Sequence, residues 1–309
     1  MIAQIQVRRG TSAEWAAADP VVLAAGEQGY DSTLKRLKIG DGTTAWASLP
    51  WTDYGTNPNI LHNWDFRINP VNQRASTGAI SSGYFYDRWM RYAGTITINA
   101  TYLSMPADAS IEQRIEGLGL SGKAVTVSIL LGDAVISGQG TFPTSAGTES
   151  VTLTGFGTAT LGYHADYMFV RITATDSTRN LQAVKLELGT VSTLAYDPPM
   201  DWAVELAKCQ RYFIALDTYP WGYGYADSAT IGEIKLGLPC VMRIDPTINV
   251  SVCTIVQPSG AVVAGTLSTV LQLGNGQLNI PFSGSGLTQY TPITASLGGG
   301  TAVMLSADL

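Results

Sequence analysis

Histidine and cysteine are scarce in this chain of 309 residues, which contains two histidines and three cysteines. An odd and sparse number of cysteines is a poor disulfide framework, so we expect Cys209, Cys240 and Cys253 to be free, buried thiols. Neither His62 nor His164 stands in a metal-binding or nucleophile signature. The sequence therefore predicts no metal and no cofactor, and it contains no recognisable catalytic motif.

Charge and long apolar runs are also limited. Charged residues make up 14% of the chain, and the formal net charge is −6. Basic residues cluster only at Arg8-Arg9 and Lys35–Lys38, which argues against nucleic acid as the main partner because phosphate binding needs grouped Lys and Arg. No apolar stretch approaches the roughly 20 residues that span a bilayer, and the N-terminus lacks the apolar run of a signal peptide. We therefore expect synthesis in a cytoplasm and no membrane insertion.

Glycine is abundant, with 33 residues, and it is interspersed with Thr, Ser and Val. This composition favours short strands over helices. A chain of this length suggests two or three domains. We predict an all-β fold, in which a small N-terminal β head is followed by two β-sandwich, jelly-roll-like domains joined by a short helix.

Residues 1–55 form the predicted head. Alternating apolar residues predict a strand near Val7, and Thr11 to Glu14 fit a capping box that opens a short helix. Asp41-Gly42 predicts a tight hairpin turn within 37–43, and a calcium loop is the less favoured alternative. About 55 residues without a disulfide make a marginal core, and oligomerisation is one way to bury exposed tryptophans.

The head carries a resemblance. The segments IQVRRGT (5–11), GEQGY (26–30) and LKIGDGTTAWASLPW (37–51) occur in this order. They resemble the head domain at the start of many phage tail fibre and tropism-determinant proteins. The resemblance implies a trimeric β-structure that anchors the protein to a phage tail or baseplate protein through residues 1–55, and synthesis in the cytoplasm of the host bacterium.

The middle domain is predicted over residues 60–197. Short segments of strand character separated by glycine-rich breaks predict a β-sandwich. These segments are Thr95–Asn99, Ala124–Leu131, Ser150–Leu153, Tyr167–Ala174 and Gln182–Leu188. The last is expected to be half-buried, since its apolar residues alternate with polar ones.

Motifs in this domain extend the resemblance to phage tail fibres. NWDF (63–66), NPVNQR (69–74), YFYDRW (84–89) and VKLELG (184–189) follow one another along the chain. Their order resembles galactose-binding-like carbohydrate modules of phage tail fibres. The resemblance implies a carbohydrate-binding module, and it assigns no individual sugar ligand.

Residues 198–209 are predicted to be a linker helix capped by Asp201, with Trp202, Leu206, Cys209 and Phe213 on one stripe. Strand-like segments then predict a second sandwich over 210–309. They are Ile231–Leu238, Ile248–Val256, Leu267–Leu273, Gln277–Phe282 and Ala302–Ser306. The motif CQRYF (209–213) resembles the start of the variable, receptor-contacting end of phage tail fibres.

An aromatic ribbon opens this last domain and supplies the first candidate site, formed by Tyr219, Trp221, Tyr223 and Tyr225. Aromatic planes pack on the apolar faces of sugar rings, so the ribbon is a candidate for glycan binding. The equally weighted alternative is an edge strand whose rings fill a subunit interface.

A second candidate glycan site is formed by Tyr84, Tyr86, Asp87, Arg88 and Trp89. Asp87 and Arg88 offer groups that hydrogen-bond sugar hydroxyls. The favoured alternative is structural, because Arg–Asp pairing and a core tryptophan often hold a sandwich together where it begins.

Together these features predict a non-catalytic, homotrimeric phage tail fibre or receptor-binding protein. It would sit in the virion tail and attach to host cell-surface polysaccharide. The alternative is a tail enzyme that hydrolyses or deacetylates the same glycan, although paired carboxylates for such chemistry are not recognisable. A secreted lectin is disfavoured by the missing signal peptide.

Overall fold

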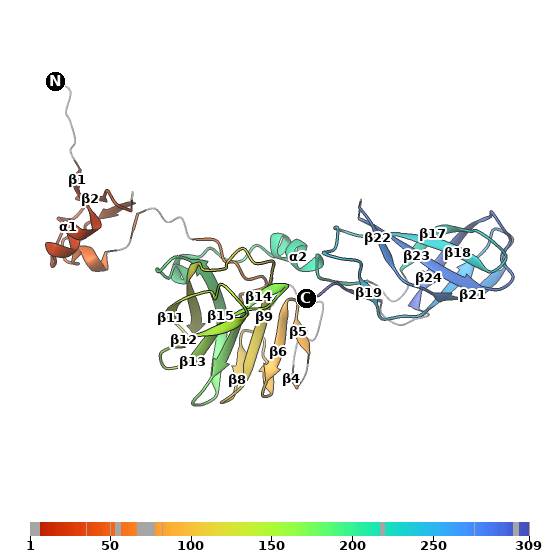
Figure 1. The fold of residues 1–309 in the computed structure, drawn as a ribbon, viewed down its shortest axis with the longest axis horizontal. Helices are drawn as coiled ribbons and strands as arrows, with labels where there is room; N and C mark the ends of the chain where they lie inside the picture. The colour runs from red at the N-terminus through yellow and green to blue at the C-terminus, as the bar shows by residue number, and fades with distance from the viewer. Residues whose placement is uncertain are drawn as a thin grey trace, which may run out of the picture. The chain divides into compact units, whose positions relative to one another are not determined.

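The computed structural model describes residues 7–34, 36–49, 51–52, 57–66, 78–81, 83–216, 220–274, 276–298 and 303–308. The chain divides into two compact units, Met1–Asn57 and Pro58–Leu309. Strands dominate both units, and the described residues contain two α-helices (Figure 1). The predicted all-β fold class is confirmed.

The first unit is a three-stranded sheet with one short helix. Its strands are β1 (Arg8–Gly10), β2 (Gln28–Asp31) and β3 (Arg36–Ile39), with β1 parallel to β2 and β2 antiparallel to β3. Helix α1 (Ser12–Ala17) begins at the predicted capping box. The Thr11 hydroxyl accepts from Glu14 N at 3.2 Å, and the Glu14 carboxylate accepts from Thr11 N at 2.7 Å.

Tryptophans form the core of this unit. The rings of Trp15 and Trp46 stack with centroids 3.8 Å apart, and Trp46 opens the short 3-10 helix η1 (Trp46–Ser48). Lys38 is buried beside them, where its Nζ donates to the carbonyl of Trp46 at 2.6 Å and lies 4.4 Å from the Trp51 ring centroid. Both stacked tryptophans are therefore buried without a second copy of the chain, so their burial is no reason for oligomerisation.

The Asp41-Gly42 turn follows β3 but does not close the hairpin predicted over 37–43. The hairpin partner of β3 is β2, which precedes it. The Asp41 carboxylate accepts from Thr43 N (2.8 Å), Thr44 N (2.7 Å) and the Thr44 hydroxyl (2.6 Å), and these bonds lower the pKa of Asp41. The Asp41 carboxylate, which a calcium loop would need as a ligand, therefore already accepts hydrogen bonds within the turn.

The chain then builds a sandwich of two six-stranded antiparallel sheets. One sheet has the order β11-β10-β15-β8-β7-β4 and the other β12-β13-β14-β9-β6-β5. The strands are β4 (Gly78–Ile80), β5 (Tyr84–Tyr86), β6 (Trp89–Ala93), β7 (Ile96–Ile98), β8 (Leu103–Met105), β9 (Ser110–Glu116), β10 (Ala124–Leu131), β11 (Ala134–Thr141), β12 (Gly147–Leu153), β13 (Gly157–Tyr163), β14 (Tyr167–Ala174) and β15 (Arg179–Leu188). One continuous apolar core lies between the sheets.

Strand β15 is buried on both faces rather than half-buried as predicted. Lys185 and Glu187, the polar residues of its outer face, are fully buried. The segment that follows covers them: the Lys185 ammonium donates to the Thr193 hydroxyl at 2.7 Å and to Asp197, and Thr193 N donates to Glu187 at 2.7 Å. Buried charges persist when they are paired and hydrogen-bonded in this way.

The linker forms helix α2 (Trp202–Gln210), preceded by the 3-10 helix η2 (Leu194–Tyr196). The Asp201 side chain caps it by accepting from Ala203 N and Val204 N. The helix buries Glu205 and Cys209, whereas Trp202 is 49% exposed. The predicted apolar stripe is thus wrong at Trp202, and the buried face of the helix instead contains Glu205, which accepts a hydrogen bond from Asn63 N at 3.3 Å.

The last part of the chain is a barrel rather than the sandwich that the sequence predicts. Its sheet runs β18-β17-β24-β20-β21-β23-β22, and pairing of β18 with β23 closes a ring of six strands. The strands are β17 (Trp221–Ala226), β18 (Ile231–Gly237), β20 (Val252–Val256), β21 (Val262–Leu267), β22 (Leu271–Leu273), β23 (Gln277–Gly284) and β24 (Pro292–Leu297). Full closure leaves no open edge in the ring.

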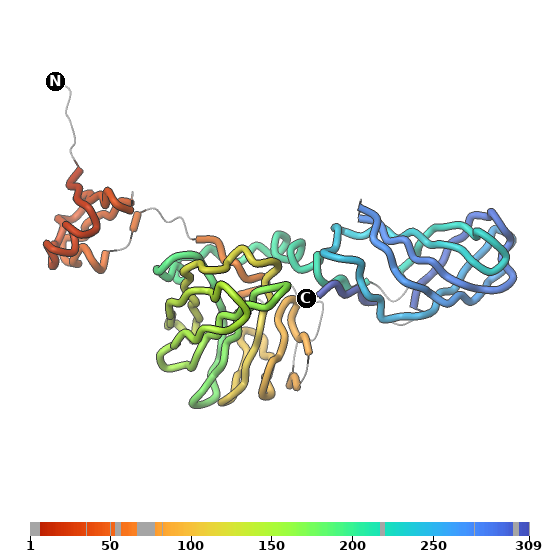
Figure 2. The backbone as a smooth tube through the Cα atoms, in the orientation of Figure 1, coloured from red at the N-terminus to blue at the C-terminus, as the bar shows by residue number. Residues whose placement is uncertain are grey.

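A small sheet joins the barrel to the helix. It has the order β16-β25-β19, with β16 (Phe213–Ala215) directly after α2, β19 (Thr247–Ile248), and β25 (Met304–Ser306) at the end of the chain. The last described residues therefore return to the beginning of this region (Figure 2). A separate apolar core fills the barrel.

Candidate functional site

Three aromatic side chains form a ridge on the outside of the barrel. They are Trp221, Tyr223 and Tyr225 of β17, and their exposed fractions are 53%, 72% and 42%. Alternate residues of a strand share a face, so all three rings point outward. We call these three residues the aromatic ridge. The fourth predicted member, Tyr219, lies outside the described residues.

Glycines between the rings explain why all of them point outward. Gly222 and Gly224 face the interior, where an added Cβ would lie 2.2 Å from Ile234 Cγ2 and 1.8 Å from the Glu233 carbonyl oxygen, respectively. Neither position has room for a side chain, because β18 approaches β17 too closely. The alternating Gly-aromatic pattern therefore builds a strand with a bare inner face and a fully aromatic outer face.

Polar groups from neighbouring strands lie along one side of the aromatic ridge. In the antiparallel register Tyr223 is opposite Lys235 and Tyr225 is opposite Glu233. Glu233 accepts from Asn279 Nδ2 at 3.0 Å, and its carboxylate lies 3.7 Å from Lys235 Nζ. A hydrogen bond to Glu233 raises the pKa of Tyr225. Glu233 thus holds the last ring of the aromatic ridge and an amide donor in place.

A further exposed aromatic residue, Tyr290, lies near the end of β17 and was not recognised from the sequence. It is 78% exposed, and its backbone adopts a left-handed conformation with φ 57°. Its N–H donates to the carbonyl of Ala226 at 2.7 Å, which places it at the end of β17 beyond Tyr225. A positive φ is uncommon for a residue other than glycine. No periodic pattern marks this residue, because it lies in the loop before β24.

The second predicted glycan site is corrected by the structure. Asp87 and Trp89 are fully buried, and Tyr86 and Arg88 are 1% and 2% exposed. Tyr84 is the one member of this set that is half-buried. Buried side chains have no surface to offer a dissolved glycan, so the structural alternative for this cluster is the one that the structure supports.

These buried residues join the sandwich to the helix. The Arg88 guanidinium lies 3.5 Å from the Tyr212 ring centroid and donates to the carbonyl of Arg114. Trp89 Nε1 donates to the carbonyl of Asn63 at 2.9 Å, and Asn63 N donates to Glu205 at 3.3 Å. The NWDF, YFYDRW and CQRYF motifs, far apart in the sequence, therefore meet in one buried junction.

The two histidines lie in different surroundings. Burial, together with Arg88, Lys208 and Arg211, lowers the pKa of His62 to about 3, and a pair of hydrogen bonds ties the His62 backbone to the Gln113 side chain. His164 stacks on Tyr167 with centroids 4.5 Å apart. Among the residues that the structure describes, no group of three or more His, Cys, Asp or Glu could hold a metal ion.

All three cysteines are free, as predicted. Cys209 and Cys253 are buried, and Cys240 is half-buried. Burial raises the pKa of the Cys253 thiol to about 11 and also raises that of Cys240. These thiols are therefore protonated near neutral pH and are poor nucleophiles.

Comparison with known proteins decides the nature of the first unit. Residues 5–44 match the family model of the major tropism determinant N-terminal domain. The first unit therefore contains a tropism-determinant-like head, which we call the tropism-determinant head. The match includes β1, α1, β2, β3 and the Asp41 turn. No curated protein matches the chain.

The tropism-determinant head indicates a phage tail protein that takes part in host recognition. This agrees with the predicted resemblance and with a location in the virion tail. In the described part of the chain, no helix has the length and apolar character needed to cross a bilayer.

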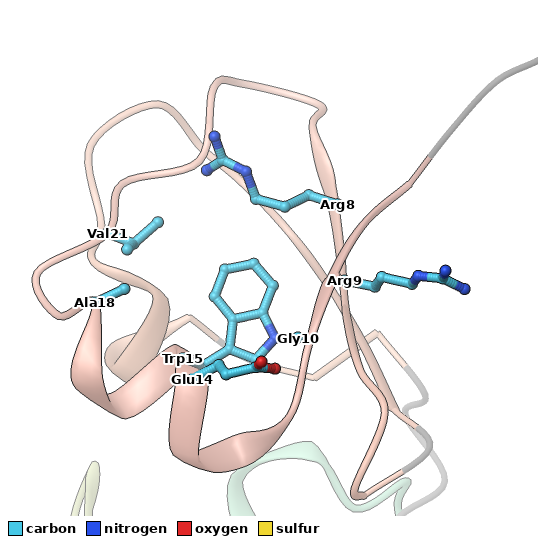
Figure 3. A pocket seen from close by; sticks show the side chains of 7 residues that line it. All are labelled: Arg8, Arg9, Gly10, Glu14, Trp15, Ala18 and Val21. Atoms are coloured by element: carbon cyan, nitrogen blue, oxygen red, sulfur yellow. The ribbon is translucent and has the colours of Figure 1, made fainter.

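The tropism-determinant head carries a groove of about 300 Å³ beside β1. It is lined by Arg8, Arg9, Gly10, Glu14, Trp15, Ala18 and Val21 (Figure 3). The two arginines leave β1 on opposite sides, and Arg8 lies 3.4 Å from Glu27. Strand β1 is at the edge of its sheet. An exposed edge strand flanked by arginines can pair with an extended acidic segment of a partner.

Proposed function

We propose that this chain is a non-catalytic receptor-binding protein that holds host surface polysaccharide on the aromatic ridge of its barrel. The tropism-determinant head attaches it to a phage tail or baseplate protein. The sandwich follows the head along the chain, and the buried junction around Arg88 joins it to helix α2, which leads into the barrel. That the sandwich is also a galactose-binding-like module stays a prediction, since its candidate residues are buried.

The aromatic ridge is the observation that carries this proposal. Tyr223 is 72% exposed, and no aromatic neighbour within the barrel wall covers it among the described residues. Exposed aromatic rings beside fixed hydrogen-bonding groups are suited to sugars, which present apolar C–H faces and hydroxyls together. Glu233, Lys235 and Asn279 supply those groups at the side of the rings.

We further propose that the protein acts as a homotrimer. The support is the tropism-determinant head, whose resemblance implies a trimer. Three barrels on one particle raise the effective concentration of the second and third contacts, so weak single sites add up to firm attachment. A site with only three rings is expected to bind weakly on its own, and multivalency compensates for this.

An array of bacterial surface polysaccharides tests the proposal. Full-length protein should bind at least one of them and should also bind the cells that display it. Trp221→Ala and Tyr223→Ala should each weaken a single site by about 2- to 13-fold, the range expected for one stacking ring. Avidity should increase this loss on cells.

The control is Val262→Ala on β21, which lies three strands from β17 in either direction around the ring. Val262 is 65% exposed, and its truncation should leave both binding and melting temperature unchanged. If the ridge variants instead lose the oligomer or melt much earlier, the ridge is a subunit interface and the proposal is wrong.

The enzymatic alternative is tested on the same polysaccharides. Incubation with the purified protein should release neither new reducing ends nor acetate. Release of either would make the protein a glycan hydrolase or esterase rather than a binding protein. Cleavage that persists in Tyr223→Ala would place the chemistry away from the aromatic ridge.

A further inference from the structure

We propose that the aromatic ridge binds an internal stretch of a linear, non-anionic polysaccharide that lies along β17, rather than a terminal sugar. This inference rests on the proposed function and specifies its ligand. It follows from the direction, the length and the charge of the surface.

The aromatic ridge is linear. Its rings stand at alternate positions of one strand, so neighbouring rings are about 6.6 Å apart and the ridge from Trp221 to Tyr225 is about 13 Å long. A single sugar cannot contact all three rings at this spacing. Full use of the surface requires a chain of several sugars running parallel to the strand.

Tyr290 is an exposed aromatic residue near the Tyr225 end of the aromatic ridge. It lies two residues before Pro292, which is the register partner of Tyr225. Its N–H is bonded to Ala226, so it is held beyond the Tyr225 end of the aromatic ridge. The left-handed backbone of Tyr290 is maintained at this position although the side chain is 78% exposed and contributes little to the core. Strained residues of this kind cluster at ligand-contacting sites.

The polar groups also follow the strand and do not converge on one point. Glu233 and Lys235 lie two residues apart on β18, opposite Tyr225 and Tyr223. Thr294 lies on the other side on β24, opposite Tyr223, whereas Ser296, opposite Trp221, is buried. A site for a chain end gathers its polar groups around a pocket. Here Glu233 and Lys235 follow the direction of β17, so the polar groups do not enclose a chain end.

The charge of the surface disfavours a polyanion. Asp227 and Glu233 both act on Tyr225 and raise its pKa, and Lys235 is the single cation in the register opposite the ridge. Two carboxylates against one ammonium repel a repeating acidic polymer. Hydroxyl-rich sugars without acidic groups fit these donors and acceptors.

A length series tests the inference with the full chain. The probes are size-fractionated fragments, from the monosaccharide upward, of a neutral polysaccharide that the protein binds on the array. Calorimetry in solution should show affinity rising by about 2- to 13-fold for each additional ring engaged, and then reaching a plateau. Chemical capping of the chain ends should leave the affinity unchanged.

Variants separate the centre of the aromatic ridge from its ends. Tyr223→Ala should weaken binding of every fragment, because the central ring contacts each of them. Trp221→Ala and Tyr290→Ala should weaken long fragments by about 2- to 13-fold and leave the shortest bound fragment unaffected. Val262→Ala is again the matched control on the opposite strand of the ring.

The failure of this inference differs from the failure of the proposed function. If single sugars bind as tightly as long fragments, or if capped ends abolish binding, the site takes a chain end and the inference is overturned while glycan binding stands. If only acidic polysaccharides bind, the charge argument is overturned. If no polysaccharide binds at all, the proposed function fails together with this inference.

Discussion

Single residues divide into those that hold this protein together and those left free for contact. Arg88 and Trp221 illustrate the division, since both were candidates for the same role. Arg88 is 2% exposed and stacks on Tyr212, whereas Trp221 is 53% exposed. Chemical character alone did not separate them, because a guanidinium and an indole serve equally well in a core or at a binding surface.

Removal of Arg88 should strongly destabilise the second unit. Arg88→Ala removes a buried cation that lies over Tyr212 and 3.9 Å from Asp308. Loss of one partner from such a buried arrangement costs about 3–5 kcal/mol of unfolding free energy. Urea denaturation followed by tryptophan fluorescence measures this change.

Arg211→Ala provides the control for Arg88. Arg211 is also next to Tyr212, but it is 48% exposed and pairs with Glu116 at 3.3 Å. An exposed ion pair contributes about 0–1 kcal/mol, so this variant should remain near the stability of the parent. If Arg88→Ala and Arg211→Ala lower the free energy of unfolding equally, the stability of the buried junction does not depend on Arg88.

His62 should make the second unit less stable in acid. Its pKa is about 3 in the folded protein, below the ordinary value of 6.5, because burial and nearby cations disfavour the charged ring. The unfolded chain therefore takes up a proton as pH falls from about 6.5 towards 3, while the folded chain does not. The contribution of His62 to stability is complete above pH 6.5 and is lost through this window.

The size of the acid effect follows from linkage. One proton bound only by the unfolded state changes the unfolding free energy by up to about 1.4 kcal/mol per pH unit. His62→Gln should reduce the slope of stability against pH in this window, and the reduction is measured against the parent protein under the same conditions. An unaltered slope in His62→Gln would mean that His62 takes up its proton equally in the folded and the unfolded chain, which would contradict the lowered pKa.

At the scale of elements, close approach between strands shapes the candidate site. Strand β17 has glycines at its two inward positions, 222 and 224, where β18 leaves no room for a side chain. The residues between and beside these glycines are aromatic, and they point outward. One alternating pattern of glycine and aromatic residues therefore accounts for both the packing of β17 against β18 and the aromatic outer surface.

Gly224→Ala should destabilise the barrel. The new methyl group would lie 1.8 Å from the Glu233 carbonyl oxygen, which is backbone and cannot rotate away. Forcing a methyl group into a packed site typically costs about 1–3 kcal/mol. The matched control is Gly237→Ala on β18, where an added Cβ meets nothing within 4 Å.

Thermal and urea unfolding measure both glycine variants. Gly237→Ala should change the unfolding free energy by much less than Gly224→Ala. If Gly224→Ala is as stable as the control, β17 and β18 are farther apart than the structure shows. We also expect Gly224→Ala to weaken the proposed glycan binding, because a shift of β17 would misplace the rings of the aromatic ridge.

At the scale of the whole molecule, three parts have distinct physical tasks. The head buries its own tryptophans, the sandwich has a continuous core of its own, and the barrel has another. Each part can therefore keep its shape while surface residues vary. In a receptor-binding protein this separation allows the contact surface to change without loss of the anchor.

The proposed homotrimer is tested by mass. Light scattering at micromolar concentration should give about three times the chain mass of 32.8 kDa. Deletion of residues 1–57 should shift the mass towards the monomer if the head drives assembly. A monomer mass for the full chain would overturn the homotrimer, and an unchanged trimer after deletion would assign assembly to the second unit.

Local order was largely readable from the sequence. The bounds of β10 (Ala124–Leu131) and β14 (Tyr167–Ala174) were predicted to the residue, because both are continuous runs rich in β-branched and apolar residues. The capping box of α1 and the exposed alternation of the aromatic ridge were also foreseen. These features depend on neighbours within a few positions along the chain.

The tertiary structure decided the rest. Strands β11 and β13 contain glycines and small residues and have little signal of their own, and they form because a neighbouring strand pairs with them. The NPVNQR motif and Tyr219 lie outside the described residues.

Pairing of β18 with β23, about 45 residues apart, turned an expected sandwich into a barrel. Burial also depends on segments that are distant in the sequence. Lys185 and Arg88 are buried because such segments cover them. The sequence by itself therefore determined which segments become strands and which rings share a face. Long-range packing determined which polar residues are buried in the structure and which aromatic surface remains exposed.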